Sequence, residues 1–540
     1  MTNVSDFIVD ALIAQGIDTV FAMPGEQLSP LFEALSRRCG ELRIIHPRNE
    51  QSATCMAYGY ARVTGNPSVV IIPPGPGVLN AMTGIAIGYA TSTPILAIAG
   101  QISSHAIGKG LGLLHELPDQ LGHLKALTKW AACVRSPKES PKLLREAFEQ
   151  MLTGRSRPVA LEFPPDILAA TLNWTIEKPR LRTWVPDHAQ LERAADLLKL
   201  ARKPLIVAGG GAVRAADSLA ELADRLQAPV VSNSGGRGVV SERSYLSFTW
   251  PGGHRLWKEA DVVLAVGTRF SQPRTNWGFD TAMHIIRIDT DPGELSGGRE
   301  CDVQLLGDAS SAIKALIELV GGYRAASREQ ELSHLKSSLN EEFRGLSPQY
   351  EYVSALRESL PEDGILVDEL SQIGYVCRFS FPVLQPRTYV TSGYQGALGY
   401  GFPAALGAKA AHPHRAVLSV NGDGGFMYGA AELSTAVQQK LGVVAVVFND
   451  NCFGNIARDQ RSASYSIGTE LHNPDFVRFA ESFGAFGARA HTPAELRCQI
   501  EAAFCRELPT VIEVPVGEMP SPWHFIRLPR VRGRSVQLQY

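Results

Sequence analysis

Short apolar runs rich in β-branched residues recur along the whole chain, and helix-like segments separate them. They fall into three successive sets: 19–22, 42–45, 68–72, 94–99 and 158–163; then 204–208, 229–232, 261–266 and 284–289; then 364–368, 387–391, 416–420, 443–448 and 509–515. Strands that alternate with helices in this way favour a parallel sheet with helices on both faces. The sequence therefore predicts an α/β fold of three successive parallel-sheet domains.

The breaks between the three sets predict the domain boundaries. A stretch with Pro and Trp at 166–188 separates the first two sets, and a polar, helix-prone stretch at 327–347 separates the last two. We expect an N-terminal domain at 1–170, a central Rossmann-like domain at 187–322, a C-terminal domain at 345–518 and a tail at 519–540. The total of 540 residues agrees with roughly 100 to 200 residues per domain.

The composition favours small-molecule chemistry. A net charge of −2 and a hydrophobic content of 45% fit neither a nucleic-acid binder nor a disordered chain. No apolar run reaches membrane-spanning length, and the N-terminus lacks the regions of a signal peptide. The eight cysteines include no C-x-x-C pair, which is typical of reduced thiols. We expect a cytoplasmic protein without nucleic-acid or membrane partners.

The stretch 416–456, which belongs to the third set, contains the pattern that most directly indicates a binding site. The apolar run 417–420 leads into Asn421-Gly422-Asp423-Gly424-Gly425, a helix-compatible segment extends to residue 439, and the run 443–448 leads into Asn449-Asp450-Asn451. This pattern predicts strand, glycine turn, helix and strand. Glycines allow a close backbone approach to an anion, and carboxylates at neighbouring strand ends can hold a hard cation. The stretch fits a diphosphate bridged by Mg²⁺.

The spacing within this stretch resembles the thiamine diphosphate signature, in which GDG is followed after a fixed interval by an Asn pair. The resemblance implies that Asp423, Asp450 and the main-chain carbonyl of Cys452 hold Mg²⁺, with Asp450 at the place of the usual second Asn. An Asp there keeps an oxygen ligand. The remaining cofactor-binding residues that it implies in this stretch are Gly422, Gly424, Gly425, Phe453 and Gly454.

Further motifs extend the resemblance to the acetohydroxyacid synthase-like group of thiamine diphosphate enzymes over essentially the whole chain. They include the segments 21–26, 48–50, 74–77 with Asn80, 100–101, 128–131 and 266–270. The resemblance implies that Glu50 contacts the cofactor pyrimidine and promotes loss of the C2 proton, with Gly25 and Asn80 also at the cofactor. Without this resemblance, Glu50 would be interpreted as a carboxylate at the start of a helix, where it interacts favourably with the helix dipole.

Two segments of the third domain complete the implied cofactor site. The loop 393–399 resembles the one that bends the cofactor into a V shape, so that Gly396 contacts the cofactor and Leu398 lies between its two rings. Ser371 and Gln372 follow the strand 364–368 and are expected to bind the diphosphate. Because Glu50 and the metal motif lie in different domains, the family arrangement implies active sites between subunits of a homodimer or homotetramer.

Departures from named relatives bear on the reaction. Pro73 stands where benzoylformate decarboxylase has a histidine, and Gln27 stands where benzaldehyde lyase has one. Asp119-Gln120, followed by the segment 128–131, resembles benzaldehyde lyase in residues and spacing. The resemblance implies that Gln120 orients the carbonyl or hydroxyl of the bound intermediate. These features favour a carbon–carbon lyase or carboligase that acts on 2-oxo acids, 2-hydroxyketones or 2-hydroxyacyl compounds.

Several alternatives stay open. A 2-oxo acid decarboxylase and an acetolactate synthase share the same cofactor machinery, although Asp459 and the segment 271–274 differ from acetohydroxyacid synthase. A non-catalytic cofactor-binding homologue would have no use for Glu50. Gly209-Gly210-Gly211 allows FAD or another nucleotide in the central domain, but it is not the G-x-G-x-x-G fingerprint of a nicotinamide dehydrogenase. The basic segment 527–534 is expected to be a solvated tail, with closure over a site or binding of an acidic substrate end, such as a CoA phosphate, as alternatives.

Overall fold

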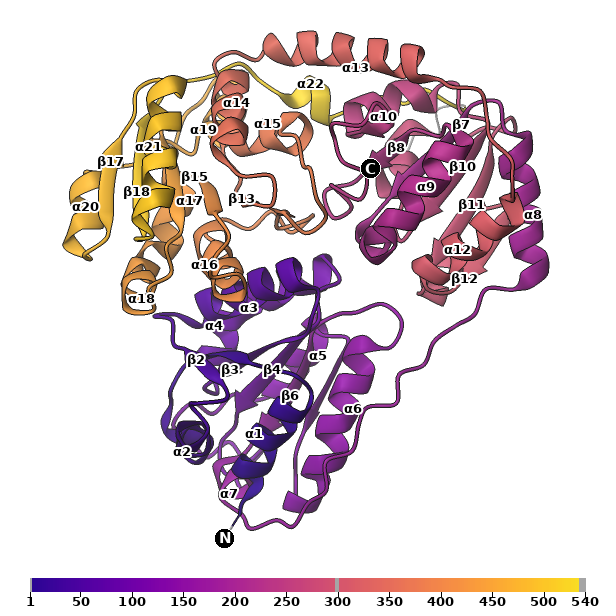
Figure 1. Cartoon of the computed structure of the whole chain (residues 1–540). Coiled ribbons are helices and arrows are strands. Elements are labelled where there is room, and N and C mark those ends of the chain that lie inside the picture. Colours follow the sequence, from indigo (N-terminus) through magenta and orange to yellow (C-terminus); the bar gives the residue numbers. More distant parts are fainter. Residues whose placement is uncertain (1, 297–300, 534–540) are drawn as a thin grey trace.

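The computed structural model of the chain describes residues 2–296 and 301–533. Three α/β units follow one another along the chain: the first lies at the bottom of Figure 1, the central one at the upper right and the third at the upper left. Each unit contains one six-stranded sheet, and the strand pairs within these sheets run parallel. The predicted fold class is confirmed.

The first sheet has the strand order β2-β1-β3-β4-β6-β5. Its strands are β1 (Thr19–Ala22), β2 (Arg43–Ile45), β3 (Ser68–Ile72), β4 (Ile95–Gly100), β5 (Trp130–Cys133) and β6 (Val159–Phe163). The helices around it are α1 (Val4–Ala14), α2 (Ser29–Arg37), α3 (Glu50–Thr64), α4 (Pro76–Ala90), α5 (Gln120–Leu127), α6 (Ser140–Leu152) and α7 (Pro165–Leu168).

The central sheet has the order β12-β11-β10-β7-β8-β9. Its strands are β7 (Pro204–Ala208), β8 (Val230–Ser232), β9 (Ser247–Phe248), β10 (Val262–Val266), β11 (His284–Asp289) and β12 (Val303–Leu306). Its helices are α8 (His188–Leu200), α9 (Ala216–Leu226), α10 (Trp250–Trp257), α11 (Pro292–Ser296) and α12 (Ala309–Val320). A Cβ atom on Gly209 or Gly211 would clash with the backbone of Gly267, so close packing of two loops accounts for glycine there.

The third sheet has the order β14-β13-β15-β16-β18-β17. Its strands are β13 (Ile365–Asp368), β14 (Tyr389–Val390), β15 (Val417–Gly422), β16 (Val444–Asn449), β17 (Phe486–Arg489) and β18 (Thr510–Pro515). Its helices are α14 (Gln349–Ser359), α15 (Gln372–Ser380), α16 (Gly401–Ala411), α17 (Asp423–Gly429), α18 (Leu433–Gln438), α19 (Gly454–Ser462), α20 (Phe476–Ser482) and α21 (Pro493–Arg506). The connector that leads into this domain forms the helix α13 (Glu329–Arg344).

Four strands were absent from the sequence prediction: β5, β9, β12 and β17. All four are edge strands of their sheets. An edge strand has one neighbour and is partly solvated, so it needs no continuous apolar run. Strand β17, for example, contains no buried residue, and β9 has only two residues. The prediction of one helix up to residue 439 was also wrong, because a 3₁₀ turn (Ala430–Glu432) separates α17 from α18.

Helices α3 and α16 join the first and third domains at very close range. A Cβ atom on Gly59 would clash with the carbonyl oxygen of Ala404, and one on Gly407 would clash with that of Met56. These two contacts pair residue numbers that rise in α3 with numbers that fall in α16, so the helices are antiparallel. The two domains share one cluster of buried apolar residues, to which both helices contribute.

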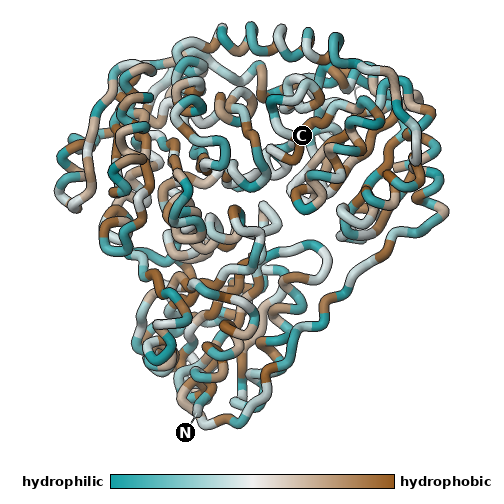
Figure 2. Tube along the Cα trace, in the orientation of Figure 1, coloured by the Kyte–Doolittle hydropathy of each residue, from teal (hydrophilic) through white to brown (hydrophobic). Residues whose placement is uncertain are grey.

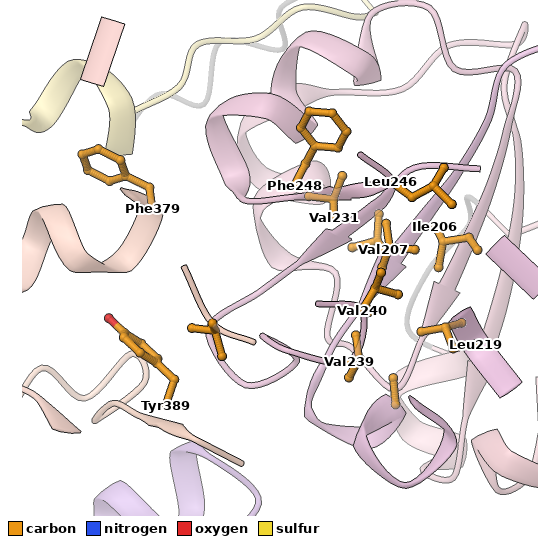
Figure 3. Packing of buried hydrophobic residues seen from close by; sticks show 14 of the residues in the cluster. Ile206, Val207, Leu219, Val231, Val239, Val240, Leu246, Phe248, Phe379 and Tyr389 are labelled. Carbon is orange, nitrogen blue, oxygen red and sulfur yellow. The ribbon is translucent and has the colours of Figure 1, made fainter. Parts of the chain in front are cut away.

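The central and third domains share a second hydrophobic cluster. Figure 3 shows Ile206, Val207 and Val231 of the central sheet, with Phe379 and Tyr389 of the third domain on the facing side. In Figure 2 apolar residues concentrate in the interiors of the three units, while the long helix α13 at the top is largely hydrophilic. Among the described residues, no helix is both long enough and apolar enough to cross a membrane.

The predicted tail packs against the central domain as far as it is described. It contains the short helix α22 (Trp523–Ile526), and the backbone N–H groups of Val531 and Arg532 both donate to the carbonyl of Trp277 at 3.0 Å. The expectation of a solvated tail is therefore wrong for this part of it. Arg534 and the following residues lie outside the described part of the chain.

Candidate active site

The expected diphosphate and metal residues lie at the carboxyl ends of three neighbouring strands of the third sheet. Strand β15 extends to Gly422, so that Asp423 is the first residue of α17, and Asp450 directly follows β16. Ser371 caps the N-terminus of α15 beyond β13, where its Oγ accepts a hydrogen bond from the Gly374 N–H at 3.0 Å. The edge of a parallel sheet beyond its carboxyl ends is where such folds bind ligands.

Asp423 and Asp450 are close enough to influence each other. Burial raises the pKa of Asp450 to about 6, and the negative charge of Asp423 adds to this effect. Burial likewise raises the pKa of Asp423. The backbone N–H of Cys452 acts in the opposite direction and lowers the pKa of both carboxyl groups. Two neighbouring buried carboxylates repel each other unless one of them is protonated or a cation binds between them.

Two amide side chains support this acidic pair. Gln372 donates from Nε2 to Oδ2 of Asp450 at 2.8 Å, and it also accepts from the Met519 N–H at 3.0 Å. Asn473 donates from Nδ2 to Oδ2 of Asp423 at 2.6 Å, and the same nitrogen is 3.0 Å from Oδ1 of Asn449. Sequence reasoning missed Asn473, because it belongs to an irregular segment 50 residues beyond Asp423.

The donor set fits a hard divalent cation. The described residues contain no group of three or more His, Cys, Asp or Glu side chains that could hold a metal ion, so neutral oxygens would have to complete the coordination. The side chains of Asp423 and Asp450 with the main chain of Cys452 supply oxygen ligands of the kind that Mg²⁺ prefers. A bound cation would also relieve the repulsion between the two carboxylates.

The expected glycines lie where a side chain would clash. A Cβ atom on Gly424 would be 2.5 Å from Cε1 of Phe453, and one on Gly454 would be 2.6 Å from Oδ2 of Asp450. A Cβ atom on Gly425 would clash with the carboxyl group of Glu369. Gly422 is the N-cap residue of α17. These glycines bring the strand ends and the helix N-terminus close together around Asp423.

The loop 393–399 is anchored at its end by a buried carboxyl group. Gly396 has a φ of +58° and Gly399 a φ of +77°, a region that favours glycine. The N–H of Gly399 donates to Oε1 of Glu369, whose Oε2 is buried without a hydrogen-bond partner. Burial raises the pKa of Glu369 to about 8. Leu398 is half-buried, so it keeps an accessible surface.

The other expected half of the site lies in the first domain. Glu50 is the first residue of α3, and its Oε2 accepts a hydrogen bond from Nδ2 of Asn80 at 3.0 Å. A Cβ atom on Gly77 would be 3.3 Å from Oε1 of Glu50 and 2.7 Å from Cγ of Pro73. Gly25 packs against the same proline, because a Cβ atom there would be 2.8 Å from that of Pro73. Glu50, Asn80 and Gly25 therefore gather around Pro73.

Gln120 lies beside this half-site, but its amide is engaged within the chain. Its Oε1 accepts from the Gly75 N–H at 2.7 Å, while Nε2 donates to the Gly100 carbonyl at 3.0 Å and to Oε1 of Glu162 at 2.9 Å. Gln120 thereby fixes the turn before α4. To orient a substrate it would have to exchange one of these bonds.

Gln27 has more freedom than Gln120. Its Nε2 donates to the Leu114 carbonyl at 3.3 Å, whereas its Oε1 is buried without a partner. The neighbouring His115 has a φ of +69° and a buried Nδ1 without a partner. The backbone of His115 packs against Gly75. Nothing in the local sequence around His115 indicates that the loop 107–118 folds back over Gly75.

Within one chain the two halves do not meet. Glu50 contacts the first turns of α4 at Gly77 and Asn80, whereas Gly393 contacts Thr91, which follows the end of α4. Gly77 and Thr91 are separated by about 20 Å at 1.5 Å per residue. The antiparallel contact of α3 with α16 leads to the same conclusion, because Glu50 begins α3 while the loop 393–399 precedes α16.

Three family models match the chain: the N-terminal TPP binding domain of thiamine pyrophosphate enzymes over residues 2–123, their central domain over 191–316 and their C-terminal TPP binding domain over 372–514. A probable 2-ketoarginine decarboxylase of Pseudomonas aeruginosa is 33% identical, over 94% of this chain and 93% of its own. A probable acetolactate synthase large subunit of Methanocaldococcus jannaschii is 31% identical, over 95% and 91%. The acetolactate synthase isozyme 2 large subunit of Escherichia coli is 30% identical over 97% of both chains.

Proposed function

Because the chain belongs to the thiamine pyrophosphate enzyme family, we propose that it is a Mg²⁺-dependent carbon–carbon lyase or carboligase. Its substrates in this proposal are 2-oxo acids, 2-hydroxyketones or 2-hydroxyacyl compounds. When bound, thiamine diphosphate supplies a nucleophilic carbon and an electron sink. The protein binds and orients the reactants and moves protons at defined atoms.

The pair of buried carboxyl groups at Asp423 and Asp450 carries the proposal of Mg²⁺ binding. Their mutual repulsion and burial give a dication a large electrostatic gain, and the N-terminus of α17 at Asp423 adds favourable N–H groups for a phosphate. In this proposal Asp423, Asp450 and the Cys452 carbonyl hold the metal, and Ser371, Gln372 and the glycines around Asp423 lie at the diphosphate.

Glu50 is the proposed acid–base residue. Its carboxylate is fixed by Asn80 and lies beside Gly77, whose lack of a side chain lets Pro73 and Glu50 approach it closely. A carboxyl group held in this way can exchange a proton with a ring nitrogen. Leu398, half-buried in the loop 393–399, is the proposed apolar support between the two cofactor rings.

We propose that Glu50 of one subunit and Asp423 of another form each active site. The separation of the two halves along α4 supports this arrangement. Exposed large apolar side chains flank both halves: Leu79, Leu111, Leu113 and Leu114 near Glu50, and Met427, Tyr428, Ile456 and Ile467 near the metal residues. Apolar surface of this kind marks protein interfaces. A homodimer is the smallest assembly that would complete the site, and a homotetramer would contain two such pairs.

The choice of lyase or carboligase rests on the side chains around Glu50. Pro73 cannot transfer a proton, and the amides of Gln27 and Gln120 are poor proton donors. Without prompt protonation, a reactive carbon would persist until a second carbonyl compound captured it. The second candidate is a 2-oxo acid decarboxylase. It is favoured by His115, whose unpartnered Nδ1 lies in the loop that packs on Gly75, and by the relative that is a probable 2-ketoarginine decarboxylase.

One experiment separates the two candidates. The holoenzyme is incubated with a panel of 2-oxo acids, with and without an acceptor aldehyde, and the products are identified by mass spectrometry. The proposal expects the acceptor to raise turnover and to appear in a hydroxyketone product. Quantitative release of free aldehyde, unaffected by the acceptor and abolished in His115→Ala, would establish the decarboxylase instead.

The proposal extends to domain roles and location. We propose a pyrimidine-binding domain at 1–170, a Rossmann-like domain at 187–322 and a diphosphate-binding domain at 345–518. FAD binding by the central domain is not needed for this chemistry. A cytoplasmic location is supported by the cysteines, all eight of which are free thiols.

A further inference from the structure

Three arginines, one from each domain, converge on Gly65. Arg214 of the central domain donates from Nη2 to the Gly65 carbonyl at 3.2 Å. Arg387 of the third domain donates from Nη1 to the carbonyl of Arg62 in the first domain at 3.4 Å. The guanidinium group of Arg387 packs against Gly65, where any Cβ atom would clash with it.

The positive charge of this cluster is not compensated by the chain. Within the described residues, none of the three guanidinium groups forms an ion pair, and their hydrogen bonds go to backbone carbonyls. The Nε atom of Arg62 is buried without any partner. Burial lowers the pKa of Arg387 to about 10, and the charges of Arg62 and Arg214 add to this effect. Guanidinium groups that lie this close together repel one another and destabilise the fold unless an anion binds between them.

The backbone at this junction is also strained. Arg387 has a φ of +64°, a left-handed conformation that is unfavourable for residues other than glycine. Strain of this kind is found where a side chain must be presented to a ligand.

A cavity of about 440 Å³ is lined in part by residues that are close in sequence to two of the arginines. Pro386 and Ala216, close neighbours of Arg387 and Arg214 in the sequence, line it, together with Val239, Val240, Tyr245 and Leu246. Figure 3 shows Val239, Val240 and Leu246 on the central-domain side. The volume lies in the range of small-molecule sites. Asp217 and Asp224 also line the cavity, so an anionic group would be favoured at the arginines and disfavoured inside the cavity, where an uncharged group would fit better.

We propose that the junction of Arg62, Arg214 and Arg387 binds the phosphate group of a small molecule whose uncharged body occupies the adjoining cavity. A phosphate group carries more than one negative charge and several acceptor oxygens, which match three guanidinium groups better than a single carboxylate does. Because the arginines come from three domains, the bound phosphate holds the domains together. This site is separate from the one proposed for the cofactor diphosphate at Asp423.

Calorimetric titration of pyrophosphate into the holoenzyme tests the proposal. Thiamine diphosphate and Mg²⁺ are kept saturating, so that the probe cannot occupy the cofactor site. We expect one pyrophosphate per chain, bound more weakly as salt is added. Arg214→Ala should weaken binding about tenfold or more, since hydrogen bonds to charged groups contribute strongly. Arg214 is exposed, so this variant should fold.

Matched variants and a second probe complete the experiment. Arg193→Ala removes another exposed arginine of the central domain and should bind pyrophosphate as the wild type does, whereas Arg387→Gln should lose binding. ADP should bind at least as tightly as pyrophosphate because its nucleoside can enter the cavity, and adenosine alone should not bind. Absence of pyrophosphate binding, or equal binding by the wild type and Arg214→Ala, would overturn the phosphate site. Exclusion of ADP where pyrophosphate binds would overturn the role of the cavity.

Discussion

Glu50 and Gly393 lie at opposite ends of helix α4 in the same chain, about 20 Å apart along the helix axis. Glu50 contacts the helix start through Asn80, and Gly393 contacts Thr91 just beyond its end. The proposed acid–base residue and the loop proposed to bend the cofactor therefore cannot act on one molecule within one chain. Glu50 and the loop 393–399 lie at opposite ends of the α3–α16 contact, which is why the proposed site takes its missing half from a partner chain.

Substitutions of Asp423 and Asp450, the proposed metal ligands, should show whether metal binding depends on the charge of these side chains or on their oxygen atoms. Asp423→Ala removes an oxygen ligand and should weaken cofactor retention by about 100-fold or more, since even supporting groups of metal sites contribute roughly 10- to 100-fold. Asp450→Asn keeps an oxygen ligand and removes the repulsion with Asp423, so it should still bind Mg²⁺ and thiamine diphosphate. Calorimetry of both variants measures this. Unchanged affinity in Asp423→Ala would remove it from the metal site.

Glu50→Gln should slow catalysis without loss of the cofactor. The amide preserves the size of the side chain and can still accept the hydrogen bond from Asn80, but it cannot exchange a proton. Exchange of the C2 proton of the bound cofactor, followed by NMR, should fall by about 10² to 10⁴-fold, the usual contribution of a general acid–base group. If the exchange rate stays at the wild-type value, Glu50 does not activate the cofactor.

Glu369 should make the protein less stable as the pH rises. Its pKa is raised from the usual carboxyl value to about 8 in the folded state, so the folded protein holds a proton that the unfolded chain releases between about pH 4.5 and 8. The stabilisation is complete below this window and is lost as the pH rises through it.

Glu369→Gln mimics the protonated carboxyl group and should remove this pH dependence. Thermal unfolding at pH 5 and pH 8.5 measures the effect: the variant should gain stability over the wild type at the higher pH, on the order of a few kcal/mol. The exposed Glu362→Gln is the control and should behave as the wild type. Parallel pH profiles for the wild type and Glu369→Gln would show that Glu369 is ionised throughout.

Gly59→Ala should disrupt the contact between the first and third domains. The added methyl group would clash with the carbonyl of Ala404, and overpacking of a close helix contact costs about 1 to 3 kcal/mol or more. Gly40→Ala is the matched control, because no atom lies within 4 Å of the added Cβ. Denaturant unfolding should show a lower midpoint for Gly59→Ala alone; equal midpoints would mean that α3 and α16 can separate at little cost.

The sequence was most informative where function follows a strand directly. The position of Asp423 and Asp450 at neighbouring strand ends could be predicted because strand, turn and helix leave a local pattern, and parallel strands bring their ends together. Asn473 and Glu369 left no such pattern, because their roles depend on contacts with residues 50 and 30 positions away. The engagement of Gln120 with Gly75, Gly100 and Glu162 is likewise a property of packing. The separation of Glu50 from Gly393 could be seen only once α3, α4 and α16 were placed together.

A mixing experiment tests the central claim, that Glu50 and Asp423 of different chains form each active site. Glu50→Gln and Asp423→Ala are each inactive by this account. When the two are unfolded together, refolded and reassembled in equal amounts, half of the dimers should contain one chain of each kind. One of the two sites in such a dimer combines an intact Glu50 with an intact Asp423, so the mixture should recover roughly a quarter of the wild-type activity by random pairing of the two chains. If each chain formed its own site, every site would carry one lesion, and a mixture as inactive as its components would contradict the account.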